Sequence, residues 1–255
     1  MHPRYLRAGL SALAFLVVAA GICRAQVATQ KIKLDTSFVY TRGSYGLPTD
    51  TDIYVVLVNP SYETDTWRLQ ASLPYVHLKG AASVVGNAGT SAASRTEEGM
   101  GDASVTVTRK LGDVGEGWFP SFAAKVKLPT ADESKGLGTG KTDFSFEADL
   151  FKKVGDLVPY GTFGYQFLGH SQAYPMKSGF YASAGFADTV APKIVVGVGG
   201  NWRERIISGG SQALELMAFV QRTLSDNLHL QLFALHGFTD ASPDLALGAT
   251  LGLTF

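Results

Sequence analysis

The last thirteen residues of the chain, Pro243 to Phe255, alternate strictly between two kinds of side chain. One parity holds Leu245, Leu247, Ala249, Leu251, Leu253 and Phe255, and the other holds Asp244, Ala246, Gly248, Thr250, Gly252 and Thr254. Because successive side chains of a strand point to opposite faces, this stretch predicts a β-strand with one apolar face. A tilted strand that crosses a membrane needs about 9–11 residues, so the stretch is long enough. The pattern favours a transmembrane β-barrel, although a soluble β-sandwich strand shows the same alternation.

The N-terminal residues, 1–25, have the organisation of a secretory signal peptide. Arg4 and Arg7 precede an apolar run from Leu10 to Ile22, and Ala25 follows as a small residue at the expected cleavage point. The run is shorter than the roughly 20 residues of a spanning helix. Cys23 suggests a lipoprotein, but the bulky Ile22 stands where that motif has a small residue. We therefore expect residues 26–255 to form the mature domain.

The composition of residues 26–255 excludes several classes of function. The single cysteine of the chain lies in the expected signal peptide, so neither a disulfide nor a thiolate metal site is predicted. Removing three arginines, Arg4, Arg7 and Arg24, from the 22 basic residues leaves 19 against 22 acidic ones. A slightly acidic chain offers no electrostatic footprint for nucleic acid. No other apolar run is long enough for a membrane helix, so membrane crossing requires a closed barrel.

The rest of the chain predicts an all-β, antiparallel up-and-down barrel of twelve strands. The expected strands are 31–41, 51–61, 66–79, 98–111, 117–129, 141–153, 157–169, 178–187, 193–206, 212–224, 227–238 and 243–255. Connections after even-numbered strands are short, and several after odd-numbered strands are long. Bacterial barrels combine short periplasmic turns with longer external loops, so both termini are expected in the periplasm. The segment 51–61 is apolar on both faces and cannot be oriented from its sequence.

Charged residues gather on the parity that would face the barrel lumen. The candidate lumen and mouth residues are Asp102, Lys125, Lys127, Asp143, Glu147, Arg203 and Glu215, with Lys33, Asp35, Arg68 and Asp149 on the same parity. Hairpins centred near Lys135 and Gly209 would place Lys127 opposite Asp143 and Arg203 opposite Glu215. Such pairs either brace neighbouring strands or select solutes by charge, and both roles are compatible.

Motifs for catalysis or cofactor binding are incomplete. The segment Gly136–Thr142 ends in Gly-Lys-Thr but leads into an alternating strand, whereas a phosphate loop requires a following helix. Asp132 and Glu133 fall far short of the oxygen ligands of a Ca²⁺ site. The histidines 77, 170, 229 and 236 lie in no nucleophile or zinc motif. We expect no catalytic residue, cofactor or metal, and an outer-membrane lipid hydrolase remains the enzymatic alternative.

Three segments resemble a known family of outer-membrane proteins. They are Gly99–Val105 (GMGDASV), Lys127–Asp132 (KLPTAD) and Gly136–Phe144 (GLGTGKTDF), and they resemble the transporters of the MetA-type phenol-degradation pathway. The terminal Phe255 also resembles the assembly signal that the barrel-insertion machinery reads in such proteins. The resemblance implies an outer-membrane barrel that passes small aromatic or apolar compounds.

These observations predict a channel for the passive passage of small solutes across the outer membrane. Neither a nucleotide site nor a plug domain is recognised that would couple transport to energy. Eight strands make a barrel filled by side chains and 16–18 leave a water channel, so twelve strands predict a narrow lumen. The expected partners are outer-membrane lipids, the barrel-assembly machinery and a small-molecule solute. A scaffold or adhesin is the non-enzymatic alternative.

Overall fold

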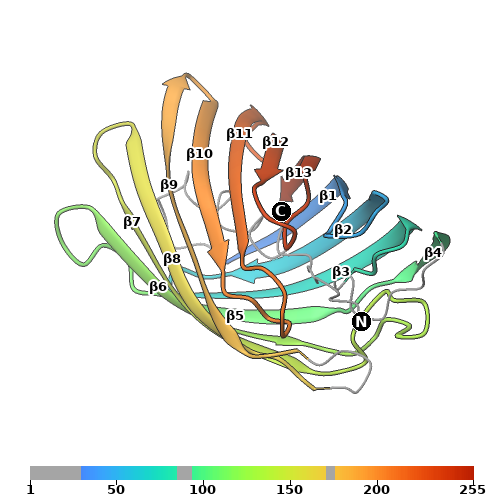
Figure 1. Ribbon diagram of the computed structural model, residues 1–255. Helices are drawn as coiled ribbons and strands as arrows, with labels where there is room; N and C mark the ends of the chain where they lie inside the picture. Colours follow the sequence, from blue (N-terminus) through green and yellow to red (C-terminus); the bar gives the residue numbers. More distant parts are fainter. Residues whose placement is uncertain (1–29, 85–93, 171–175) are drawn as a thin grey trace.

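The computed structural model describes residues 30–84, 94–170 and 176–255, and within these ranges all regular elements are β-strands (Figure 1). The expected signal peptide lies outside the described residues. The strands are β1 (Lys31–Gly43), β2 (Thr51–Glu63), β3 (Trp67–Gly80), β4 (Arg95–Met100), β5 (Ser104–Lys110), β6 (Trp118–Lys127), β7 (Asp143–Lys152), β8 (Leu157–Phe167), β9 (Gly179–Ala191), β10 (Ile194–Arg203), β11 (Ala213–Ser225), β12 (Leu228–Gly237) and β13 (Leu245–Thr254). No helix in the described ranges is long and apolar enough to cross a membrane.

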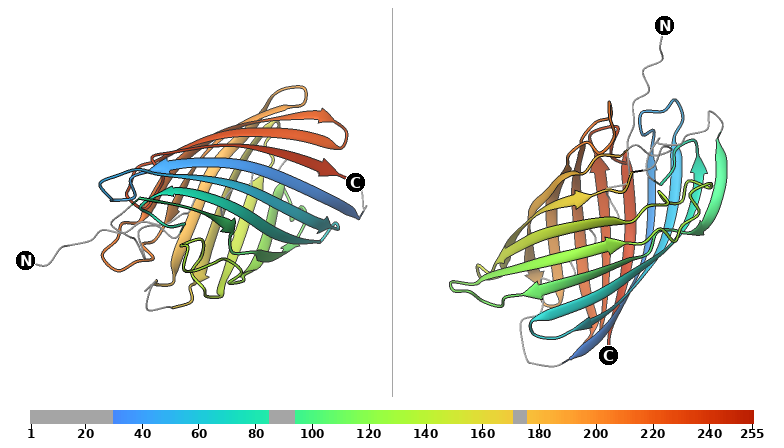
Figure 2. Two further views of the ribbon diagram at one scale, coloured as in Figure 1. Left: turned by 90° about the vertical axis from the view of Figure 1, so that its right-hand side faces the viewer. Right: turned by 90° about the horizontal axis from the view of Figure 1, so that it is seen from below.

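The strands form one closed antiparallel barrel. Apart from β4 and β5, which do not pair with each other, strands that follow one another in the sequence are paired, and β1 pairs with β13, which joins the first strand to the last (Figure 2). The segments β4 and β5 both pair with β3 and occupy one strand position, so the barrel has twelve strands as predicted. The prediction of an unbroken strand over 98–111 is wrong, because Gly101, Asp102 and Ala103 leave the ladder. A second correction concerns 178–187: Asp188 and Thr189 continue the ladder with β10, and β9 ends at Ala191.

Alternating burial along the strands divides the wall into an outer and an inner face. On β13, Leu245, Leu247 and Leu251 are exposed outward, whereas Ala246 and Thr250 are buried inside. The same alternation orients β2, whose sequence gave no direction: Val55 is 1% exposed and its neighbour Val56 is 42% exposed. The large exposed side chains of the outer face suit contact with lipid.

The two ends of the barrel differ in their connections. The six connections 44–50, 81–94, 128–142, 168–178, 204–212 and 238–244 lie at the end that we call the long-loop end. The opposite, short-turn end has the connections 64–66, 111–117, 153–156, 192–193 and 226–227. The predicted sorting of loops by length is confirmed, and Lys193 lies in one of the two-residue turns at a φ of 66°.

An apolar cluster covers part of the inner wall. Most of its members lie on β1, β2, β3, β11, β12 and β13, on one side of the barrel, and Leu137 joins them from loop 128–142. Inner residues of β5 to β8 are mainly polar: Ser104, Thr106, Lys125, Ser145, Glu147, Asp149, Thr162 and Gln166. The lumen therefore has an apolar side and a polar side.

Candidate functional site: a lumen cavity beneath the long loops

The loop that follows β6 forms hydrogen bonds with the residues between β4 and β5, where the strand is interrupted. Within the described ranges β4 pairs only with β3, whereas β5 pairs with β3 and β6. The hydroxyl of Thr130 donates to the carbonyl of Gly101 at 3.0 Å and accepts from the backbone N–H of Ala103 at 2.8 Å. The N–H of Leu128 donates to the carbonyl of Ala103 at 2.8 Å. The segments 99–105 and 127–132, which are distant in the chain, are thus one structural unit.

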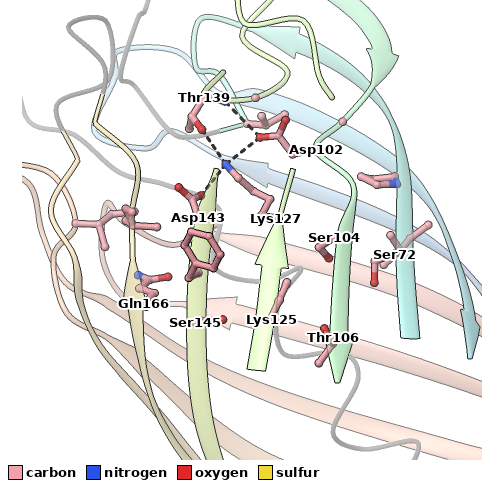
Figure 3. Close-up of a pocket in the computed structure, with 18 of the residues that line it drawn as sticks. Ser72, Asp102, Ser104, Thr106, Lys125, Lys127, Thr139, Asp143, Ser145 and Gln166 are labelled. Carbon is pink, nitrogen blue, oxygen red and sulfur yellow. Dashed lines mark hydrogen bonds and ion pairs between the residues drawn. The ribbon is translucent and has the colours of Figure 1, made fainter. Parts of the chain in front are cut away.

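Lys127 lies at the centre of the polar contacts of this unit (Figure 3). Its Nζ lies 2.9 Å from Oδ2 of Asp102 and 2.6 Å from Oδ2 of Asp143, and it donates to the hydroxyl of Thr139 at 2.7 Å. The ladder places Lys127 directly opposite Asp143, which confirms the predicted register. Asp102 also accepts the N–H of Ala131 at 3.1 Å. Lys127 therefore ties the loop to the inner wall, and its ammonium is surrounded by acceptors.

A cavity of about 330 Å³ opens below this loop inside the barrel. Small-molecule sites measure roughly 300–1,000 Å³, so the cavity suits a small solute. Its apolar lining includes Ile53, Val55, Leu57, Val76, Val84, Leu137, Leu168, Met176 and Ile206. Its polar lining includes Gln70, Ser72, Asp102, Ser104, Thr106, Lys125, Lys127, Thr139, Asp143, Ser145, Glu147, Gln166, Tyr181 and Arg203.

Six of the seven residues predicted to lie at the lumen or mouth line this cavity, and Glu215 is the exception. The predicted pairing of Arg203 with Glu215 is wrong by two residues, because the ladder places Ala213 opposite Arg203 and Asn201 opposite Glu215. The Asn201 amide donates to Oε2 of Glu215 at 3.5 Å. The hairpin is centred at residue 208, one position before Gly209, since residues 204–212 form its loop, and this moves the register by two residues. Arg203 and Glu215 are nevertheless both buried on the inner face.

Two carboxylates of the polar wall accept hydrogen bonds from hydroxyl groups. Tyr181 donates its phenol hydroxyl to Oε2 of Glu147 at 2.9 Å. Asp149 accepts from the hydroxyl of Thr162 at 2.7 Å and from that of Ser121 at 3.3 Å. Burying a polar group without a hydrogen-bond partner costs free energy, and these hydrogen bonds offset that cost in a wall whose other side faces lipid. These contacts hold both carboxylates in fixed positions.

A second charged cluster lies at the short-turn end. Glu63 accepts from the Nζ of Lys33 at 2.8 Å, and Nε of Arg68 lies 3.2 Å from its other oxygen. Lys110 adds a fourth charge, with its Nζ 3.8 Å from Glu63. The sequence placed Lys33 and Arg68 on the inner parity but assigned Glu63 to a turn. The ladder of β2 continues through Glu63, so extending the alternation by two residues would have found it.

The histidines contact partners other than serine. Nδ1 of His77 lies 3.2 Å from Glu98, and Nε2 of His229 lies 3.7 Å from Asp35. Nδ1 of His170 and of His236 contact the backbone carbonyls of Leu168 and Asp244. In the described residues these partners are carboxylates and backbone carbonyls, whereas the lipid-hydrolase alternative would require a serine at a histidine.

The acidic pair of loop 128–142 has a local structural role. The hydroxyl and backbone N–H of Ser134 both donate to Asp132, at 2.6 Å and 2.9 Å. The Ser134 hydroxyl is the main group that holds the pKa of Asp132 below its ordinary value. Among the described residues no group of three or more His, Cys, Asp or Glu is arranged to hold a metal ion. The loop therefore orders itself through its own donors.

The fold and the site define this chain as a twelve-stranded β-barrel of the outer-membrane type with a solute-sized cavity in its lumen. The family model described as "Putative MetA-pathway of phenol degradation" matches residues 36–255, and the chain belongs to this family. No curated protein sequence matches the chain.

Solved structures share the fold at low sequence identity. The COG4313 outer membrane channel from Pseudomonas putida F1 matches with a TM-score of 0.70 and 13% identity, over 92% of this chain and 98% of that one. The translocator domain of the autotransporter NalP from Neisseria meningitidis matches with a TM-score of 0.52 and 10% identity, over 93% and 91%. The KdgM porin matches with a TM-score of 0.52 and 8% identity, over 88% and 98%. Identities this low show a shared barrel fold.

Proposed function

We propose that the protein is a passive channel for small solutes in the outer membrane. The observation that carries this proposal is the cavity of about 330 Å³ inside a closed barrel. The matched structures include two whose descriptions are a channel and a porin, which supports the proposal. Membership of a phenol-degradation family supports small aromatic compounds as the solutes.

We further propose that the short-turn end, with both ends of the mature chain, faces the periplasm. Bacterial barrels have short periplasmic turns and long external loops, and the two ends of this barrel differ in that way. Residues 1–25 would then be removed as a signal peptide during export. Lipids of the outer membrane would cover the exposed apolar side chains of the outer face, and the assembly machinery would insert the barrel.

The channel function is tested by filling the lumen. Val55 and Val56 are sequence neighbours on β2, and only Val55 lines the cavity. Val55→Trp is expected to reduce ion conductance in planar bilayers and uptake of phenol by proteoliposomes severalfold, because an indole ring occupies much of a cavity of this size. Val56→Trp, which adds the same ring to the lipid-facing side, is the matched control and should leave the ion conductance and the phenol uptake unchanged.

Folding of both variants is checked by the heat-dependent shift of the barrel in gel electrophoresis. If correctly folded wild-type protein passes neither ions nor phenol, the channel proposal is wrong. If both tryptophan variants conduct like wild type, solutes do not pass through this cavity.

A further inference from the structure

The charges that line the cavity differ in how many contacts they already make. Lys127 is surrounded by Asp102, Asp143 and Thr139. Glu147 accepts the phenol hydroxyl of Tyr181. These groups are therefore held by the protein itself and are poorly placed to bind a solute.

Lys125 is different. It lines the cavity, and in the ladder its neighbours are Thr106 on β5 and Ser145 on β7. Within the part of the chain that the structure describes, no acceptor forms a hydrogen bond or a contact ion pair with its Nζ; Glu147, Lys127 and Asp143 act on it as nearby charges. A lysine ammonium has three donors, so Lys125 presents unused donors to the cavity.

An apolar surface lines the same cavity from β2. Ile53, Val55 and Leu57 are spaced by two residues, point inward and are at most 5% exposed. Two strand positions, β3 and β5, separate β2 from β6. Strands lie about 4.8 Å apart, so the two backbones are roughly 14 Å apart along the wall and inward side chains shorten that span. A molecule with the length of one substituted ring can contact both walls.

We infer that the cavity selects small amphipathic monocarboxylates, whose carboxylate contacts Lys125 and whose apolar body packs against Ile53, Val55 and Leu57. This inference rests on the proposed channel function and names the solute class of the same cavity. The charged residues of the lining are Lys125, Lys127 and Arg203 against Asp102, Asp143 and Glu147, so their charges cancel. Recognition therefore depends on the short contact with Lys125 and not on a field that attracts all anions.

The test compares benzoate with benzyl alcohol, which has a similar shape and no charge. In planar bilayers one measures the concentration of each compound that halves the ion current of wild type, Lys125→Met and Lys193→Met. Lys125→Met is expected to raise the half-blocking concentration of benzoate about tenfold and to leave the half-blocking concentration of benzyl alcohol unchanged, because only the charge-assisted hydrogen bond is lost. Lys193→Met removes a lysine from the turn between β9 and β10 and is the matched control.

The apolar contact is tested by Val55→Thr, which keeps the side-chain size. Both aromatic compounds should then block about threefold less well, because a methyl group of the apolar wall becomes a hydroxyl. Lys125→Gln replaces Lys125→Met if the latter does not fold.

The outcomes separate the inference from the channel function. An unchanged effect of benzoate on a conducting Lys125→Met channel overturns the inference and leaves the channel intact. If wild type does not conduct, calorimetric titration of the detergent-solubilised barrel with benzoate decides the inference alone: tight binding that is lost in Lys125→Met supports it, and equal or absent binding in both overturns it.

Discussion

At the residue scale, Lys127 has a structural role that its sequence position alone does not reveal. It contacts three groups from three places in the chain: Asp102 at the strand break, Asp143 at the start of β7 and Thr139 in the loop. The side chains of Asp102 and Asp143 are 8% and 13% exposed, so removing Lys127 would leave two poorly solvated carboxylates close together. This arrangement makes Lys127 a brace of the wall more than a free charge at the mouth.

Lys127→Ala is expected to lower the free energy of unfolding by about 3 kcal/mol, in the range for loss of one partner of a buried ion pair. Heat or urea unfolding of the barrel in micelles measures the change. Lys135→Ala is the control, because the hydrogen bond of Lys135 within the described residues is a long one, 3.4 Å to the carbonyl of Glu98. Equal stability of the two variants would contradict the bracing role.

Gly80, at the end of β3, combines a positive φ with a close approach of another backbone. Its φ is +150°, and a Cβ there would lie 2.6 Å from the Cα of Thr51. Gly80→Ala should therefore cost about 1–3 kcal/mol of stability in the same unfolding measurement. Gly115 also has a positive φ, of 119°, but has open space around it, so Gly115→Ala isolates the backbone strain. A smaller loss for Gly80→Ala than for Gly115→Ala would contradict the steric argument.

At the scale of elements, β13 closes the barrel. It pairs with β12 on one side and β1 on the other, and the N–H of Phe255 donates to the carbonyl of Ile32 at 2.8 Å. The Phe255 side chain is 73% exposed and so contributes little to packing within the barrel. We propose that Phe255 acts in recognition during assembly, as the sequence predicts.

Deletion of Phe255 is expected to reduce the yield of folded barrel in the outer membrane severalfold, as measured from heat-modifiable migration at native expression. The truncated protein should still fold in detergent, because the ladder of β13 ends at Thr254. Phe167→Ala removes an exposed aromatic from another strand and serves as the control. Normal assembly of the truncated protein would exclude an assembly signal at Phe255.

The sequence predicted the strands well because a wall between lipid and lumen imposes a period of two on every strand. It placed Lys127 opposite Asp143, since a hairpin with equal arms fixes that register. It predicted the wrong register for Arg203 and Glu215, because the glycines of loop 204–212 do not lie at the centre of that loop. The strand break at Gly101 was also missed: the exposed side chains lie at even positions up to Met100 and at an odd position at Val107, and residues 101–103 leave the ladder between them.

At the scale of the whole molecule, residues of the long loops at 44–50, 81–84 and 128–142 form a roof over the lumen. Leu137 is 2% exposed and packs with the inner apolar cluster, and Val84 donates its N–H to the carbonyl of Gly136 at 3.0 Å. Tyr45, in the loop after β1, is also buried there, and burial raises the pKa of its phenol, so the hydroxyl stays protonated. The roof is thus packed like a small core.

Leu137→Ala should lower stability by about 2–4 kcal/mol, as for other buried leucines, and should raise single-channel conductance because the cavity below it widens. Conductance and thermal unfolding are measured on the same preparation. Leu128→Ala, at an exposed position of the same loop, is the control. A conductance equal to that of wild type would show that the roof does not limit flow.

The division of the lumen into an apolar and a polar side has a consequence for its water. Water binds the hydroxyls, amides and charges of β5 to β8 but gains no hydrogen bonds from Ile53, Val55 and Leu57. We therefore expect water to lie mainly along the polar wall and not to fill the lumen evenly. A hydrated ion that moves along the polar wall would lose part of its hydration shell on the side of the apolar wall. An amphiphile would keep its polar group among the water molecules and its apolar part against the apolar wall. A solute that crosses such a barrel would move along a boundary between a hydrated wall and an apolar wall, as an amphiphile does at a water–oil interface.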